Sequence, residues 1–182
     1  MIALSWVTDS TAGLAWTIPV SAGMVALVSP WSRQFAWRIG AIDRPAARKL
    51  HLRATPRLGG LSAALAVFTC VVLWLMTDPT AIEQCAQYWG LLPGALVMFL
   101  VGLYDDLFRL RPSVKLALQF VAASIICSGG ICLTALDVPL LGQLHLSWLG
   151  PVLTVIWLVG VTNAMNFLDG IDGLAAGTAA LA

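Results

Sequence analysis

Charge is scarce in this sequence. Only 10% of its 182 residues are Asp, Glu, Lys or Arg, whereas 59% are hydrophobic. An average soluble domain carries about 25% charged residues. The composition therefore excludes an ordinary soluble domain, and we expect no nucleic acid among the partners.

Two further features are missing. No Lys or Arg precedes Arg33, so the charged segment that opens a cleavable signal peptide is absent. The four cysteines form no CxxC pair; they are Cys70, Cys85, Cys127 and Cys132. We interpret them as small apolar packing residues and not as metal ligands or disulfide partners.

Long apolar runs are what the sequence has instead. Each approaches the length of about 20 residues that crosses a bilayer. We predict five transmembrane spans, at residues 12–31, 59–77, 88–104, 114–135 and 148–166, and the start of a sixth near Leu174. The fold expected for residues 1–182 is a single all-α, multi-pass domain in the lipid bilayer. We expect it to be the N-terminal portion of a longer protein.

The cations lie on one side of this arrangement. Seven of the ten Lys and Arg residues fall between spans one and two, and the others are Arg109, Arg111 and Lys115, between spans three and four. Cytoplasmic loops are enriched in Lys and Arg. The pattern therefore predicts that these loops are cytoplasmic, that the N-terminus is outside, and that span five ends in the cytoplasm.

Polar residues end the fifth span in the stretch NAMNFLDGIDG. Asn163, Asn166 and Asp169 recur every three positions, which places them along one face of a helix. Asp105 and Asp106 close span three on the same predicted side. Carboxylate and amide oxygens suit Mg²⁺, which commonly also binds substrate phosphates. The sequence therefore predicts a magnesium and phosphate site at the cytoplasmic interface.

Three segments carry a family resemblance: DRPAARKLHLRATPRLGG at 43–60, GLYDDLFRLRPSVKLALQ at 102–119 and NAMNFLDGIDGL at 163–174. They resemble the polyprenyl-phosphate N-acetylhexosamine-1-phosphate transferases, which include the phospho-MurNAc-pentapeptide translocases. The resemblance implies transfer of a sugar 1-phosphate from a UDP-N-acetylhexosamine to a polyprenyl phosphate, with release of UMP. It implies Mg²⁺ as cofactor, with Mn²⁺ as an alternative, a role in starting cell-surface polysaccharides such as O-antigen, and leaves a homodimer open.

The resemblance also implies roles for individual residues. Asp105 and Asp106 match an aspartate pair assigned to catalysis or the metal, and Lys115 matches a lysine that contacts substrate phosphate. The metal ligands implied are Asp105, Asp106, Asn166 and Asp169. The substrate-binding residues implied are His51, Arg53, Arg57, Lys115, Asn163, Asn166, Asp169 and Asp172. Because TPRLGG stands where the translocases have a TPTMGG-like run, we favour UDP-N-acetylglucosamine or a related UDP-N-acetylhexosamine as donor. The acceptor implied for a bacterial source is undecaprenyl phosphate.

Two alternatives stay open. The family's later aspartate and its histidine-rich loop fall beyond Ala182, so the chain could be an inactive membrane remnant of this family. A transporter is disfavoured because transporters place polar groups near the bilayer midplane, whereas here they gather at span ends.

The one-sided cations generate a prediction about topology. Cys85, between spans two and three, should react with a membrane-impermeant maleimide added outside intact cells. A cysteine introduced by Leu110→Cys should react only after permeabilisation. The reverse labelling pattern would overturn the orientation.

Overall fold

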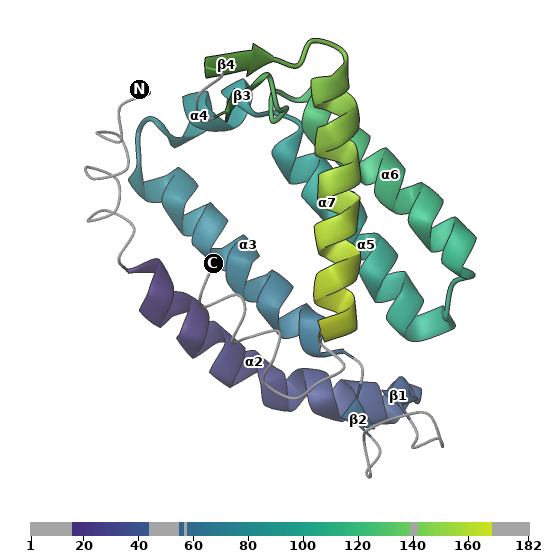
Figure 1. The fold of residues 1–182 in the computed structure, drawn as a ribbon. Coiled ribbons are helices and arrows are strands. Elements are labelled where there is room, and N and C mark those ends of the chain that lie inside the picture. Colours follow the sequence, from purple (N-terminus) through teal and green to yellow (C-terminus); the bar gives the residue numbers. More distant parts are fainter. Residues whose placement is uncertain (1–15, 44–54, 57, 139–141, 169–182) are drawn as a thin grey trace. The chain divides into compact units, whose positions relative to one another are not determined.

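Helices make up most of the structure. The computed structural model describes residues 16–43, 55–56, 58–138 and 142–168. Its helices are α2 (Thr17–Ile39), α3 (Gly59–Thr77), α4 (Ala81–Gln87), α5 (Leu91–Phe108), α6 (Pro112–Ser128) and α7 (Leu149–Leu168). Four short strands, β1 (Ile42–Asp43), β2 (Thr55–Pro56), β3 (Ala135–Val138) and β4 (Gly142–His145), form two antiparallel pairs, β1 with β2 and β3 with β4 (Figure 1). The helical fold class is confirmed, and the two strand pairs were not predicted.

Three of the described helices are long and apolar enough to cross a membrane. They are α3, α5 and α7, and α6 is a shorter apolar helix of 17 residues. Large apolar side chains point outward from these helices, as with Phe68, Leu96 and Trp157, whose exposed fractions are 64%, 56% and 72%. Such surfaces are stable in lipid and not in water. The chain is therefore a helical membrane protein.

Helix boundaries differ from the predicted spans in three places. The first helix was expected to end at residue 31, but α2 continues through Pro30 to Ile39, so Arg33 and Arg38 lie on a helix. Span three was expected to end at 104, but α5 continues through the aspartate pair to Phe108. Span four was expected to reach 135, but α6 ends at Ser128 because Gly129 and Gly130 follow it.

The described structure divides into two compact units. In the first, α2 packs on α3, and β1 pairs with β2 in the connection between them. Small residues line this helix interface: Ser32, Ala36, Ser62 and Ala66 are buried, and the Ser29 hydroxyl donates to the Ser62 hydroxyl at 3.4 Å. Small side chains let two membrane helices approach closely.

A local hydrogen-bond cluster ends α3. The Asp78 carboxylate accepts bonds from the Thr80 amide and hydroxyl, both at 2.8 Å, and from the Trp74 indole N–H at 3.2 Å. The Thr80 bonds to the charged carboxylate lower the pKa of Asp78. This carboxyl group therefore stays ionised and hydrogen-bonded at neutral pH, although residues 78–87 contain no Lys or Arg.

In the second unit, α5 packs on α6 and α6 packs on α7 (Figure 1). The contact between α5 and α6 depends on glycine. A Cβ on Gly90 would lie 2.6 Å from the Gly129 Cα, and a Cβ on Gly94 would lie 2.9 Å from the Ala122 carbonyl oxygen. Gly90 and Gly94, spaced as GxxxG, therefore allow the two helices to pack closely.

The structure contradicts the prediction that no cysteine forms a disulfide. Cys127, in the last turn of α6, is bonded to Cys132, and their Cα atoms are 4.8 Å apart. The intervening Gly129 and Gly130 reverse the chain, Gly130 with a φ of 101° that favours glycine. Cys70 and Cys85 are free thiols, as the interpretation of them as unpaired residues requires.

The glycine contact predicts an asymmetric response to alanine. Gly90→Ala should lower the free energy of unfolding by about 1–3 kcal/mol, because the new methyl group meets backbone atoms that cannot rotate away. Gly102→Ala on the same helix is the matched control, since a Cβ there has nothing within 4 Å. Thermal unfolding in detergent measures both. Equal melting temperatures for the two variants would contradict the assigned contact.

Candidate functional site

The turn between α5 and α6 forms the base of the candidate site. Arg109 follows α5 in the left-handed conformation, with a φ of 54°, and its amide donates to the Asp105 carbonyl at 2.9 Å. Pro112 opens α6, where its fixed φ and missing N–H cost nothing. Between them, the Leu110 amide donates to Asp105 Oδ1 at 3.0 Å. The Asp105 side chain therefore holds the turn that follows its own helix.

An ion pair joins the two helices across this turn. Lys115 Nζ lies 2.7 Å from Asp105 Oδ2, and the exposed fractions of the two side chains are 16% and 25%. The same ammonium group donates to Asn166 Oδ1, on α7, at 3.3 Å. One cation thus binds oxygens from two other helices, and residues predicted from two separate sequence segments, 102–119 and 163–174, meet at one point.

A second contact joins α6 to α7 further along the helices. Asn163 Nδ2 donates to Gln119 Oε1 at 2.7 Å and to the carbonyl of Val159, on its own helix, at 2.8 Å. Gln119 is 2% exposed. Sequence reasoning missed this residue, although a carboxamide within the apolar run of α6 was a usable signal.

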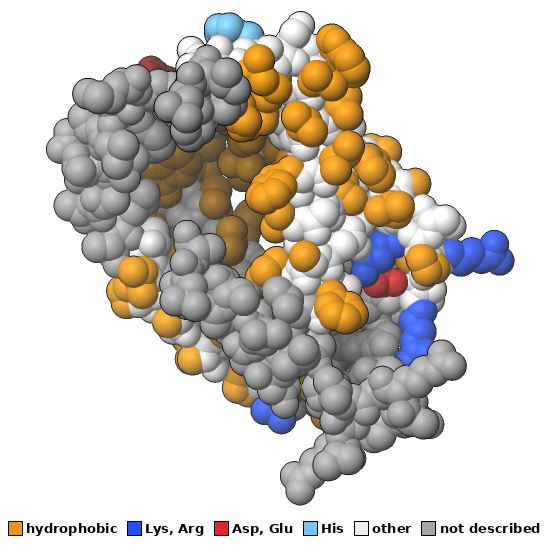
Figure 2. Space-filling view, viewed as in Figure 1, with side chains coloured by type: hydrophobic (Ala, Val, Ile, Leu, Met, Phe, Trp, Pro, Cys, Tyr) orange, Lys and Arg blue, Asp and Glu red, His pale blue; other side chains and the backbone are white. Residues whose placement is uncertain are grey.

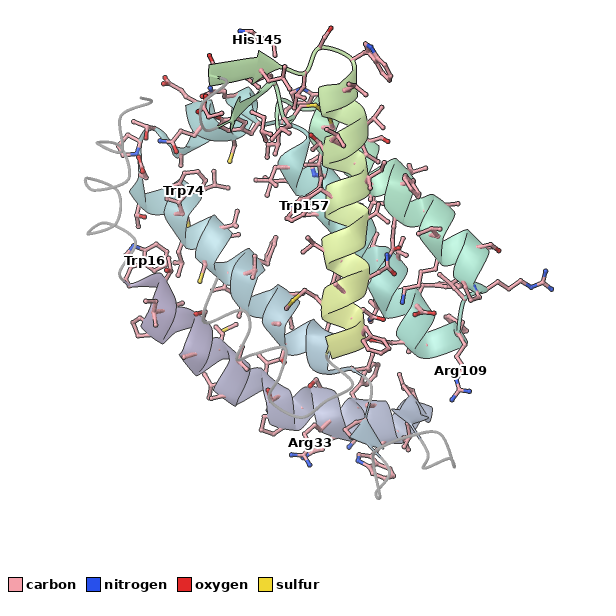
Figure 3. All side chains as sticks on the ribbon, viewed as in Figure 1. Trp16, Arg33, Trp74, Arg109, His145 and Trp157 are labelled. Carbon is pink, nitrogen blue, oxygen red and sulfur yellow. A yellow bond between two sulfur atoms is a disulfide. The ribbon has the colours of Figure 1, made fainter. Side chains whose placement is uncertain are left out.

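Other predicted site residues are placed as follows. Asp106 comes directly after Asp105 in the last turns of α5 and is half-buried. Asp169 and Asp172, together with His51, Arg53 and Arg57, lie outside the described residues. His145 is exposed at the hairpin end of the α5–α7 unit, whereas Arg109 lies at the other end (Figure 3).

The oxygen atoms of the predicted metal ligands determine whether the site suits a magnesium ion. Within the described ranges, no group of three or more His, Cys, Asp or Glu side chains is arranged to hold a metal. However, Asp105 and Asn166 already direct oxygens at one cation, the Lys115 ammonium. Hard oxygen donors of this kind, one carboxylate and one amide, are those that Mg²⁺ uses. The described part of the predicted ligand set therefore fits Mg²⁺ in chemistry.

Apolar surface surrounds the charged residues of this unit. Figure 2 shows hydrophobic side chains over the visible faces of α6 and α7, with blue and red side chains close together where α5 ends and α6 begins. A groove of about 1050 Å³ follows α7 and is lined mainly by apolar residues, among them Leu133, Leu153, Trp157 and Ala164. The polar cluster is thus bordered by a surface suited to lipid.

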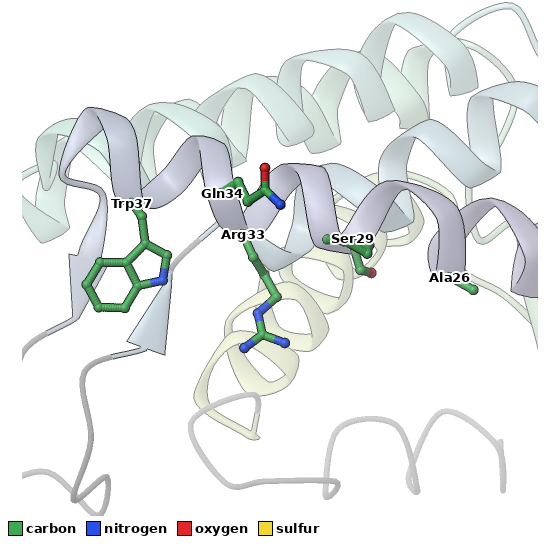
Figure 4. A pocket seen from close by; sticks show the side chains of 6 residues that line it. Ala26, Ser29, Arg33, Gln34 and Trp37 are labelled. Atoms are coloured by element: carbon green, nitrogen blue, oxygen red, sulfur yellow. The ribbon is translucent and has the colours of Figure 1, made fainter.

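A separate pocket on α2 contains none of the predicted site residues. It has a volume of about 430 Å³ and is lined by Ala26, Ser29, Pro30, Arg33, Gln34 and Trp37 (Figure 4). Arg33 is the one cation among these lining residues. The described residues of the predicted site lie instead on α5, α6 and α7.

A family model and individual curated proteins that are similar to this chain point to the same family. Residues 88–182 match the model of "Glycosyl transferase family 4". A Bacillus subtilis protein named "Probable undecaprenyl-phosphate N-acetylglucosaminyl 1-phosphate transferase" is 37% identical over 87% of this chain and 43% of its own length. A decaprenyl-phosphate N-acetylglucosaminephosphotransferase of Mycolicibacterium smegmatis is 32% identical over 93% of this chain and 44% of its own.

A third relative extends the comparison. The undecaprenyl-phosphate alpha-N-acetylglucosaminyl 1-phosphate transferase of Thermotoga maritima is 33% identical over 79% of this chain and 41% of its own length. The chain thus spans less than half the length of these curated relatives. No solved structure matches the chain.

Proposed function

Because the chain belongs to glycosyl transferase family 4, we propose that the protein transfers a sugar 1-phosphate from a UDP-sugar to a polyprenyl phosphate. The observation that carries the proposal is the meeting of Asp105, Lys115 and Asn166 at one end of three packed membrane helices. Charged groups at such positions are costly and usually functional.

The proposed chemistry needs charge stabilisation more than a base. A phosphate monoester has a second pKa near 6, so a lipid phosphate is mostly dianionic at neutral pH and can attack without losing a proton. The obstacle is the approach of two anions, which Lys115 eases by donating to phosphate oxygen. Mg²⁺, held by Asp105, Asp106 and Asn166 with Asp169, would supply further positive charge to the pyrophosphate.

The surroundings of the site support a lipid acceptor. The apolar groove along α7 includes Val161 and Ala164, which lie two residues before and one residue after Asn163 in the sequence. An isoprenoid chain placed there would bury apolar surface while its phosphate stayed near the polar helix ends. The three relatives compared above are all named for transfer to undecaprenyl or decaprenyl phosphate.

We also propose that the site faces the cytoplasm across the inner membrane and that the N-terminus is outside. The turn between α5 and α6, which carries Arg109 and Arg111, lies at the site end of these helices, and cytoplasmic loops are enriched in Lys and Arg. The Cys127–Cys132 disulfide lies at the opposite end of α6 from Lys115, and disulfides persist mainly in oxidising compartments outside the cytoplasm. The two signals agree on one orientation.

For the donor, we propose UDP-N-acetylglucosamine, in a pathway that starts a cell-surface polysaccharide. The names of the relatives specify N-acetylglucosamine, and the run TPRLGG departs from the translocase pattern. An inactive family member is the second candidate, and the reaction below distinguishes the two.

The acidic residues give a mutational prediction. In the protein expressed from its complete reading frame, Asp106→Asn or Asp169→Asn should reduce turnover by about a hundredfold or more, as expected for loss of a charge-stabilising group. Asp137→Asn, on β3 at the hairpin end, is the matched control and should keep turnover close to wild type. Membrane insertion should be normal in all three. Full activity in the first two variants would remove these aspartates from the site.

The reaction itself is the main test. Membranes containing the protein should convert UDP-N-acetylglucosamine and polyprenyl phosphate into UMP and a lipid-linked pyrophosphoryl sugar. EDTA should abolish the product and added Mg²⁺ should restore it, since otherwise two anions meet unscreened in a low-dielectric interface.

Two results would contradict this function. Release of UMP without lipid acceptor, with no lipid-linked sugar formed, would indicate a nucleotide-sugar hydrolase. Absence of both products with every UDP-N-acetylhexosamine tried would favour the inactive family member.

A further inference from the structure

Gln119 has no role in the site as described so far, yet it is the most deeply buried polar side chain near it. It lies on α6 one helical turn beyond Lys115 and is 2% exposed. A buried amide in an apolar environment costs free energy unless it is hydrogen-bonded. Its contact with Asn163 at 2.7 Å satisfies that requirement.

The direction of this hydrogen bond follows from the neighbouring backbone. The Val159 carbonyl can only accept, so the Asn163 atom 2.8 Å from it must be the amide nitrogen. The same nitrogen lies 2.7 Å from Gln119, which must therefore present its own amide oxygen. Both hydrogens of Asn163 Nδ2 are then engaged, and Asn163 Oδ1 is the atom left for a ligand.

Two side-chain hydrogen bonds join α6 to α7 at successive helical turns, Lys115 with Asn166 and Asn163 with Gln119. Lys115 and Gln119 are four residues apart on α6, and their partners Asn166 and Asn163 are three apart on α7 in the reverse order. Residues three or four apart share one helix face. The hydrogen bond between Gln119 and Asn163 therefore fixes the alignment of α6 and α7 that brings Asn166 to Lys115.

We propose that Gln119 is a positioning residue that acts through Asn163. By fixing the amide of Asn163, it presents a carbonyl oxygen, and not an N–H group, to the nucleotide-sugar complex. A carbonyl oxygen accepts from a hydroxyl or amide of the donor substrate or from a water bound to a cation. This inference rests on the proposed transferase function.

A double-mutant cycle tests the proposal. Gln119→Met removes the acceptor while keeping a side chain of similar length, and Asn163→Ala removes the group that it orients. Each should raise KM for UDP-N-acetylglucosamine or lower kcat/KM by roughly tenfold or more, while KM for the lipid acceptor stays unchanged. The double variant should be no worse than Asn163→Ala alone, because Gln119 then has nothing to position.

The matched control lies one turn further along α6. Among the described residues, the Ser124 hydroxyl donates to the Phe120 carbonyl of its own helix, so Ser124→Ala should leave both KM values near wild type. Additive losses in the double variant, or equal losses for donor and lipid, would overturn the positioning role. So would wild-type kinetics for Gln119→Met.

If Gln119→Met does not fold, a second variant at the same position tests the proposal. Gln119→Glu keeps an acceptor oxygen at the same distance along the side chain, so its KM for the donor should stay within about threefold of wild type. A rise equal to that of Asn163→Ala would overturn the proposal.

An inactive wild-type protein would refute the transferase function and not, by itself, the role of Gln119. In that case thermal unfolding is compared with and without UDP and Mg²⁺. UDP should raise the melting temperature of wild type and Ser124→Ala, and this rise should be lost in Gln119→Met and Asn163→Ala. A rise kept in Gln119→Met, or absent from wild type, would overturn the proposal.

Discussion

The ion pair between Lys115 and Asp105 is the interaction on which the polar end of α5, α6 and α7 depends. A single ammonium or carboxylate beside apolar helices would carry a desolvation cost of several kcal/mol. Pairing at 2.7 Å, with each side chain a quarter exposed or less, offsets that cost. Because Asp105 also binds the Leu110 amide, the same carboxylate fixes the turn between the helices.

This end of the helix pair is positioned by contacts at the other end. Gly90 and Gly129 bring α5 and α6 into backbone contact, and the Cys127–Cys132 disulfide closes the chain reversal after α6. A helix of 17 residues is about 25 Å long, so small side chains at one end limit how far the ends can separate at the other. The ion pair between Asp105 and Lys115 thus joins helices α5 and α6, which also contact each other at their opposite ends.

Much of the site could be predicted because its residues contrast with their surroundings. Asp105, Lys115 and Asn166 are polar side chains at the ends of apolar runs, and charge asymmetry placed them on one side before their contacts were known. Gln119 was missed because its role appears only when its partner is known. That partner lies 44 residues away on another helix, a pairing that no local periodicity encodes.

The errors in the fold have equally local causes. The first span was predicted to end at residue 31, yet α2 continues through Pro30 to Ile39, because a membrane helix tolerates a lost backbone bond when its neighbours compensate. The disulfide was not predicted because Cys127 and Cys132 form no CxxC pair. They are brought together by a chain reversal at Gly129 and Gly130. Hydropathy reports which segments enter the membrane and carries little information about where the chain turns.

The charge balance among Asp105, Lys115 and Asn166 supports a metal ion as part of the proposed function. Lys115 is already neutralised by Asp105, and its second acceptor, Asn166, carries no charge. The pairing with Asp105 leaves little of the ammonium charge for two anionic substrates. In the proposed function, a divalent cation held by the aspartates would supply positive charge there and leave the ammonium available to phosphate.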